Sequence, residues 1–262
     1  MARMILFTRM MGVKSYPFPL LLPSENLGVI VHSLFLDNGA YGFYINGEYP
    51  PLDKWARMVL AAARRLAGKA RVAKLAVLPD YPLDGEWTIE AAKRLGWLAE
   101  ELHSLGFTVL AVAHQLRIVG GFMESARRLL ELDYVDGVAA PLKLTCARGG
   151  RASQSCQLEV ARQVAAACRE AGCRWLHGLG SLLSRNVVAR LAELGYTSID
   201  STSWTRPVAD HCIERCGLPR RRSARTARER ECLLNCALEY LGEWLIQPKE
   251  IIPCKYDRAS QR

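Results

Sequence analysis

Short apolar runs alternate with longer amphipathic stretches between about residues 28 and 200. The runs are rich in Val, Ile, Leu and Phe and do not alternate with polar residues, as expected of parallel strands buried on both faces. They predict six strands, at residues 28–36, 74–78, 107–113, 134–140, 174–176 and 196–199. A strand at residues 4–7 and another near the end of the chain would bring the number to eight.

The stretches between the runs carry apolar residues every three or four positions, which is typical of helices with one buried face. Three of these predicted helices end at a glycine just before a strand, at Gly106, Gly172 and Gly195. Strict alternation of strand and helix implies parallel strands with right-handed crossovers. We therefore predict an α/β fold, a TIM-type (β/α)8 barrel over residues 1–206. A doubly wound open sheet is the alternative, but no glycine-rich phosphate loop follows the first strand.

The chain changes character after the predicted barrel. Residues 207–250 predict a basic helical hairpin that packs on the barrel, and residues 251–262 predict a disordered tail. The hairpin contains two Cys-x3-Cys pairs, made of Cys212, Cys216, Cys232 and Cys236. Each pair lies on one face of a helix, so the hairpin can bring four sulfurs together. Two disulfides or one structural zinc ion would both fit this pattern.

The composition limits the class of protein. The length of 262 residues suits one barrel, and no apolar run is long enough to span a bilayer. The N-terminus does not resemble a secretory signal, so we predict a cytoplasmic protein. The net charge of +9 favours a polyanionic partner such as nucleic acid, although a solvated basic surface would give the same value. Abundant Arg and Glu suggest a thermophile, whose cytosol tolerates disulfides.

Aspartates stand at the ends of three predicted strands. In a barrel, the residues after each strand point into the mouth, where active sites form. One such aspartate is more often a helix cap or a turn former, but three on one rim indicate a site. The three are Asp37, Asp80 and Asp200. His114 and His177 also lie at strand ends, and together with the aspartates they allow a second hypothesis, a metal-dependent barrel hydrolase.

These strand-end motifs resemble those of the tRNA-guanine transglycosylase superfamily, including the related enzymes that place 7-deazaguanine bases into DNA. Asp37-Asn38-Gly39-Ala40-Tyr41 resembles the Asp-Ser-Gly-Gly-Phe signature of that family, with Asn and Ala in place of Ser and Gly. The resemblance covers about residues 28–206. The other positions that carry it are Asp80, Gln115, Gly178, Leu179, Gly180, Asp200 and Arg206.

The resemblance implies a pentosyltransferase that exchanges guanine for a 7-deazaguanine-type base in tRNA or DNA. It gives Asp200 the role of the nucleophile that holds the sugar covalently, and Asp37 that of the proton carrier. Asp80 and the Gly178–Gly180 loop would bind the base, with Gln115 and Arg206 also contacting substrate. Such a reaction needs no catalytic cofactor, so the only metal considered for it is structural zinc at the hairpin cysteines.

Aromatic and basic residues would complete a nucleic-acid site. Tyr41, Tyr81 or Trp204 could stack on an extruded base, although simple packing is the commoner explanation for each of them. The arginines expected to contact the phosphate backbone are Arg220, Arg221, Arg222 and Arg225. A non-catalytic nucleic-acid-binding protein of the same ancestry is a further alternative, and a homodimer is compatible with either reading.

Overall fold

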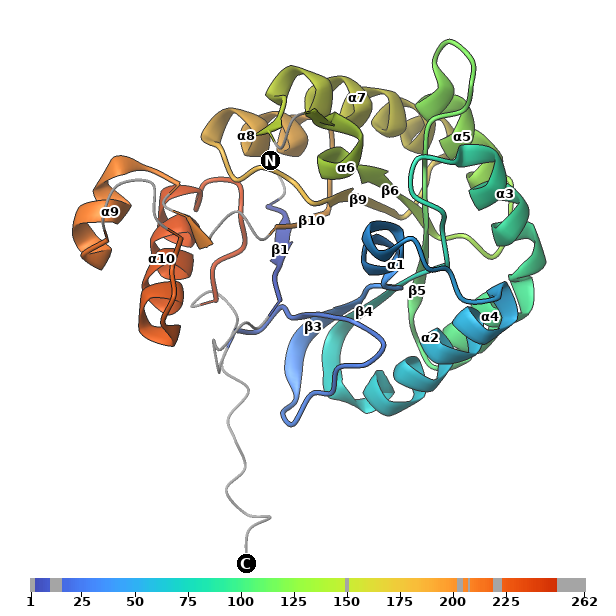
Figure 1. Cartoon of the computed structure of the whole chain (residues 1–262), viewed down its shortest axis with the longest axis horizontal. Helices are drawn as coiled ribbons and strands as arrows, with labels where there is room; N and C mark the ends of the chain where they lie inside the picture. Colours follow the sequence, from blue (N-terminus) through green and yellow to red (C-terminus); the bar gives the residue numbers. More distant parts are fainter. Residues whose placement is uncertain are drawn as a thin grey trace, which may run out of the picture.

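Eight parallel strands form the centre of the molecule in a computed structural model that describes residues 3–9, 16–148, 151–201, 205–206, 208–218 and 223–248. Their order is β1-β10-β9-β6-β5-β4-β3-β2. The ring is completed where the Thr8 N–H donates to the Phe18 carbonyl (3.2 Å) and the Leu20 N–H donates to the Thr8 carbonyl (2.8 Å). The predicted TIM (β/α)8 barrel is confirmed (Figure 1). The strands are β1 (Ile5–Phe7), β2 (Leu20–Leu21), β3 (Val31–Leu36), β4 (Ala70–Val77), β5 (Thr108–Val112), β6 (Gly137–Pro141), β9 (Trp175–Leu179) and β10 (Ser198–Asp200).

The predicted position of the eighth strand is wrong. It lies near the start of the chain, as β2, and not near the end. β2 contains only two residues, Leu20 and Leu21, so it is too short to produce a pattern in the sequence. The strand predicted at residues 174–176 is also longer than expected, because β9 continues through His177 and Gly178 to Leu179.

Helices follow β3, β4, β5, β6, β9 and β10 and form an outer ring, whereas the structure describes no helix between β1 and β3. Figure 1 looks into this ring, with α1 inside it and the α9–α10 pair outside it at the left. Ser153 and Ser184 accept hydrogen bonds from the first turns of α7 and α8, which fixes where these helices begin. The predicted helix 86–105 is two helices that meet at Leu95. The helices are α1 (Ala40–Asn46), α2 (Leu52–Leu66), the 3-10 turn η1 (Ala67–Lys69), α3 (Gly85–Arg94), α4 (Gly96–Ser104), α5 (Gly121–Leu130), α6 (Leu142–Cys146), α7 (Gln154–Ala171) and α8 (Arg185–Glu193).

The segment between α6 and α7 contains a small antiparallel pair of strands, β7 (Ala147–Arg148) and β8 (Arg151–Ala152). The disulfide Cys146–Cys156 joins the end of α6 to the first turn of α7, and a second disulfide, Cys168–Cys173, joins the end of α7 to the residues before β9. The sequence did not predict either pair, since spacings of 10 and 5 residues match no simple helical repeat. Among the described residues, no helix is long and apolar enough to cross a membrane.

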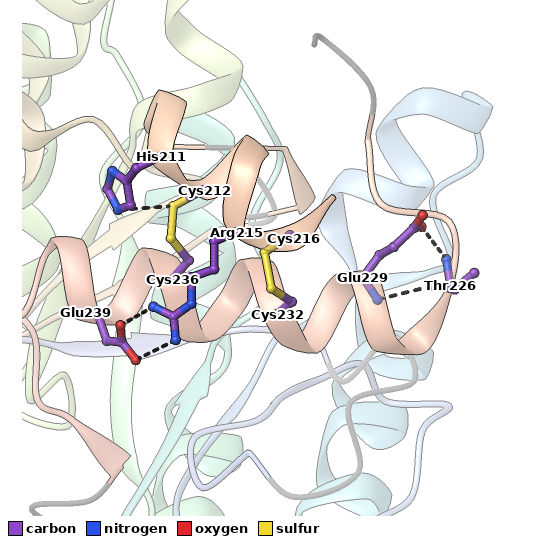
Figure 2. Close-up of a disulfide and its surroundings, with 9 residues drawn as sticks. All are labelled: His211, Cys212, Arg215, Cys216, Thr226, Glu229, Cys232, Cys236 and Glu239. Atoms are coloured by element: carbon purple, nitrogen blue, oxygen red, sulfur yellow. Dashed lines mark hydrogen bonds and ion pairs between the residues drawn. A yellow bond between two sulfur atoms is a disulfide. The ribbon is translucent and has the colours of Figure 1, made fainter. Parts of the chain in front are cut away.

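Two helices, α9 (Asp210–Cys216) and α10 (Ala227–Tyr240), carry the cysteine pairs of the predicted hairpin. Disulfides Cys212–Cys236 and Cys216–Cys232 join them, as Figure 2 shows. The zinc alternative therefore does not describe these cysteines, whose sulfurs are bonded to one another. α10 begins with a capping box between Thr226 and Glu229.

Candidate active site

Asp37 lies directly after β3, at the end of the barrel where the strands have their carboxyl termini. Its Oδ1 accepts a hydrogen bond from the Gly39 N–H at 3.1 Å. Burial is the main cause that raises the pKa of this carboxyl to about 7. The charges of Asp200 and Asp80 raise the pKa of Asp37 further, whereas the Gly39 N–H lowers it. A group with a pKa near neutrality can both accept and return a proton.

Asp80, after β4, is buried and held on both carboxylate oxygens. Its Oδ1 accepts from the Asn38 side-chain amide at 2.6 Å, and its Oδ2 lies 2.6 Å from His114 Nε2. Asn38 also donates to the Leu78 carbonyl (2.6 Å), while its own backbone carbonyl accepts from the indole of Trp55 (2.8 Å). This network fixes Asp80 beside Asp37 and ties the loop after β3 to the core.

Asp200 ends β10 and is held from the neighbouring strand β9. Its Oδ1 accepts from the Gly180 N–H at 2.9 Å and lies 3.2 Å from His177 Nε2. The other ring nitrogen of His177 is 2.7 Å from Ser198 Oγ, and the ring stacks on Phe35 with centroids 4.5 Å apart. His177 is fully buried, so it orients Asp200 from inside the barrel.

Lys143 follows β6 and is exposed. Its stem packs so closely on Gly180 that a Cβ at that glycine would lie 2.6 Å from Lys143 Cβ. The Lys143 amine lies 5.7 Å from the centre of the Tyr41 ring. Because Tyr41 belongs to α1, which follows β3, the amine extends from one part of the rim towards another. The rim thus carries the Lys143 amine in addition to the three carboxyl groups.

The structure places the other predicted site residues in different surroundings. Gln115 is exposed after β5, and Tyr41 is half exposed on α1. Gly178 is buried inside β9, where a Cβ would be 3.0 Å from Leu142 Cδ1, so this glycine serves packing. Leu179 is the last residue of β9. Gly180, with φ +66°, holds Asp200 through its N–H.

The predicted backbone-binding arginines are described only in part. Arg220, Arg221 and Arg222, like Trp204, lie outside the described residues. The Arg206 Nε donates to Ser223 Oγ at 3.1 Å, and Arg225 is exposed beside the start of α10. Contact between these side chains and a phosphate backbone stays a prediction.

Comparison with known proteins gives similarity of fold only. No known family profile and no curated protein matches the chain. Among solved structures, a provisionally assigned fructose-1,6-biphosphate aldolase from Coccidioides immitis is 11% identical, with a TM-score of 0.52 over 93% of this chain and 89% of that one. The YdjI aldolase from Escherichia coli K12 is 16% identical, with a TM-score of 0.45 over 92% and 91% of the two chains. QR15, an aldolase, is 11% identical, with a TM-score of 0.47 over 76% and 89%.

The predicted membership of the tRNA-guanine transglycosylase superfamily is wrong, since the solved barrel whose fold this chain shares at a TM-score of 0.52 is described as an aldolase and not as a transglycosylase. The pentosyltransferase activity and the base exchange are wrong for the same reason, and so is the shared ancestry assumed in the nucleic-acid-binding alternative. Nucleic acid as a partner stays a prediction. The resemblance rested on short motifs at strand ends. Barrel enzymes in general have polar residues at the C-terminal ends of their strands, so aspartates at those positions do not identify a family.

The hydrolase hypothesis is not supported either. His114 and His177 contact different carboxylates, Asp80 and Asp200, and both rings are engaged in hydrogen bonds. Among the described residues, the one group of three candidate metal ligands close enough to share an ion is His211, Cys212 and Cys236, away from the mouth. Two of its members are already joined as a disulfide.

Sequence reasoning missed the positions that organise the mouth. The motif comparison treats Asn38 only as a departure from a signature, and the hydrolase hypothesis treats His114 and His177 as metal ligands, whereas in the structure all three side chains hold carboxylates. Lys143 is not among the predicted site residues, although it stands three residues after a predicted strand. Treating every polar residue at a strand end as part of one rim would have included it.

Proposed function

We propose that this chain is an acid–base enzyme of the aldolase type, which makes or breaks a carbon–carbon bond beside a carbonyl group. The observation that carries the proposal is the Asp37 carboxyl, whose pKa is raised to about 7 at the mouth of the barrel. Aldolase is also the activity named for the fungal barrel that shares this fold. That likeness concerns the fold, so the proposal depends on the residues of this chain.

The proposed cleavage uses one proton carrier in two steps. The Asp37 carboxylate removes the proton from the β-hydroxyl of a β-hydroxycarbonyl substrate. The new C=O bond forms as the Cα–Cβ bond breaks, and the electron pair of that bond moves into an enolate. The protonated Asp37 then returns the proton to the enolate carbon, giving an aldehyde and a second carbonyl compound. A pKa near neutrality suits both steps, because neither protonation state is costly to reach.

The fixed groups at the mouth assist this transfer. Asp80 and Asp200 are each held by a histidine and a second donor, so they keep their positions while Asp37 changes charge. The Lys143 amine is the cation that we assign to the enolate oxygen. A preorganised positive group at a developing negative charge lowers the barrier of such a step.

A fluorogenic β-hydroxyketone that releases a naphthaldehyde tests the proposal directly. We expect the wild-type protein to release the aldehyde and to exchange the α-hydrogens of simple ketones for deuterium in D2O. Asp37→Asn should lose both activities, whereas Asp133→Asn, at an exposed carboxylate, should keep them. Absence of both activities in the wild-type protein, over a panel of ketones and aldehydes, would overturn the proposed reaction.

A further inference from the structure

Leu83 has a backbone conformation that a leucine rarely adopts. Its φ is +69°, and it is the one non-glycine residue with positive φ among those that the structure describes. It stands third in a turn closed by a hydrogen bond from the Asp84 N–H to the Tyr81 carbonyl (3.0 Å), with Pro82 in second place. Glycine is the usual residue at the third position of such turns, because a side chain is strained there.

Burial does not compensate for this strain. The Leu83 side chain is 48% exposed, so it contributes little to the core. Strained residues of this kind persist where the surroundings hold them and where the strain serves a function. The conformation of Leu83 therefore needs an explanation other than the stability of the fold.

The turn is connected to the carboxylates of the mouth. It begins one residue after Asp80, and the Leu83 N–H points to His114 Nδ1 at 3.4 Å. The other nitrogen of the same ring is 2.6 Å from Asp80 Oδ2. Because Nδ1 accepts from Leu83, Nε2 carries the proton that is donated to Asp80. One imidazole thus positions both the carboxylate and the strained turn.

Other exposed apolar side chains lie in the segments that follow β3, β4 and β5. Gly85 packs on the segment after β5, since a Cβ there would lie 2.7 Å from the His114 carbonyl, and the Trp87 ring lies 5.4 Å from that of Tyr81. We call these exposed apolar residues, together with Leu83, the apolar rim; they are Tyr41, Ile45, Leu83, Trp87, Ile118 and Val119. Exposed apolar groups beside an acid–base site are suited to an apolar part of a ligand.

We propose that Leu83 is a specificity-determining residue that contacts substrate, and that the carbonyl substrate carries an apolar group which lies against the apolar rim. The inference rests on the proposed function in taking the ligand to be a carbonyl compound. The strained turn holds the leucine towards the ligand, and His114 fixes the position of that turn relative to Asp80.

Binding of a series of methyl ketones of increasing chain length, followed by ligand-observed NMR, tests this inference without requiring turnover. For the wild-type protein, we expect the Kd to fall by roughly two- to fourfold for each added methylene that becomes buried. Leu83→Asn should remove most of this dependence. Val29→Asn, at an equally exposed apolar residue before β3 at the opposite end of the barrel, should keep it.

Melting temperatures separate a role in binding from a structural role. Asn and Gly tolerate positive φ, so neither Leu83→Asn nor Leu83→Gly should lower the melting temperature. A clear loss of stability in both variants, or a chain-length dependence that is absent in the wild type or unchanged in Leu83→Asn, would overturn the inference. If binding depends on chain length but no aldol cleavage occurs, the role of Leu83 in binding stands and the proposed aldolase function is overturned. If cleavage occurs but binding does not depend on chain length, the proposed function stands and the role of Leu83 is overturned.

Discussion

The barrel mouth and the α9–α10 hairpin both contain polar segments that are fixed in position, but the interactions that fix them differ. At the mouth, hydrogen bonds fix buried carboxylates above a large apolar core. In the described part of the hairpin, the buried members of the separate apolar cluster are Cys212, Leu218, Leu233 and Cys236, and two disulfides join the helices. A large core can offset the cost of burying Asp80 and part of Asp37, whereas a small one depends on covalent links.

This difference explains where chemistry can be placed. Cross-linked cysteines are already bonded and do not titrate, so the hairpin offers rigidity and exposed arginines. The mouth contains groups that exchange protons, and burial shifts the pKa of Asp37 towards neutrality. The substitutions below should therefore affect activity at the mouth and local stability in the hairpin.

The largest effect is expected for Asp37→Asn. The amide has nearly the same shape but cannot carry the proton, so aldol cleavage should fall by roughly a hundredfold to ten-thousandfold. The melting temperature at pH 7 should not decrease. Steady-state kinetics beside a thermal melt measure both quantities, and a variant with nearly normal turnover would remove Asp37 from the mechanism.

Opening the Cys212–Cys236 disulfide should have the next largest effect, confined to the hairpin. The bond closes a loop over a separation of 24 residues, so Cys212→Ala/Cys236→Ala should destabilise the hairpin by about 3 kcal/mol. Hydrogen exchange in α10 should accelerate, while exchange in β4 and β5 should not. The matched control is Cys168→Ala/Cys173→Ala, which removes a disulfide that spans 5 residues and should lower stability by a smaller amount. Equal acceleration in the barrel strands would contradict the separation of the two regions.

Asn38→Ala tests the polar network itself. The substitution removes an amide that joins Asp80 to the Leu78 carbonyl and whose oxygen accepts from the Ala40 N–H. Buried groups left without partners should lower the free energy of unfolding by roughly 2 kcal/mol, and activity should fall because Asp80 is less well held. Chemical denaturation measures the loss, with Asn46→Ala at an exposed asparagine as control. Equal stability of the two variants would show that the network is not needed.

The smallest effect is expected on the surface of the hairpin. Arg215 pairs with Glu239 across α9 and α10, beside the two disulfides (Figure 2). Both side chains are exposed, so solvent and salt screen the pair. Arg215→Ala should leave the melting temperature of the oxidised protein unchanged within error. A large decrease would mean that the ion pair, and not the disulfides, holds the hairpin.

The alternation of apolar runs and amphipathic helices was sufficient to predict the barrel, because that pattern reflects burial alone. It also placed Asp37, Asp80 and Asp200 at one rim, since parallel strands end at the same face. The two-residue strand β2 leaves no such pattern. Nor could the sequence assign His114 to Asp80 and His177 to Asp200, because that choice depends on the register of neighbouring strands.

Local chemistry was harder to predict than architecture. Nothing in the sequence distinguishes Leu83 from any other leucine, although Pro82 before it is typical of a turn. The helical spacing of the hairpin cysteines predicts that they lie close together, whereas the spacing of Cys146–Cys156 and Cys168–Cys173 predicts no pairing. The resemblance to transglycosylases came from residue types that the geometry of a barrel mouth favours in general.

A direct titration of the Asp37 carboxyl tests the central claim. Carbon-13 NMR of protein labelled at aspartate carboxyls, with Asp37→Asn to assign the signal, would follow its protonation. We predict a midpoint near pH 7, against the ordinary value of 3.8. Since the folded-state pKa is the higher one, the stabilisation from this group is complete below about pH 4 and is lost as the pH rises through 7. Asp37→Asn should then match the wild type in stability near pH 4 and exceed it at pH 8. A midpoint below about 5, within the usual range of aspartates, would contradict the account.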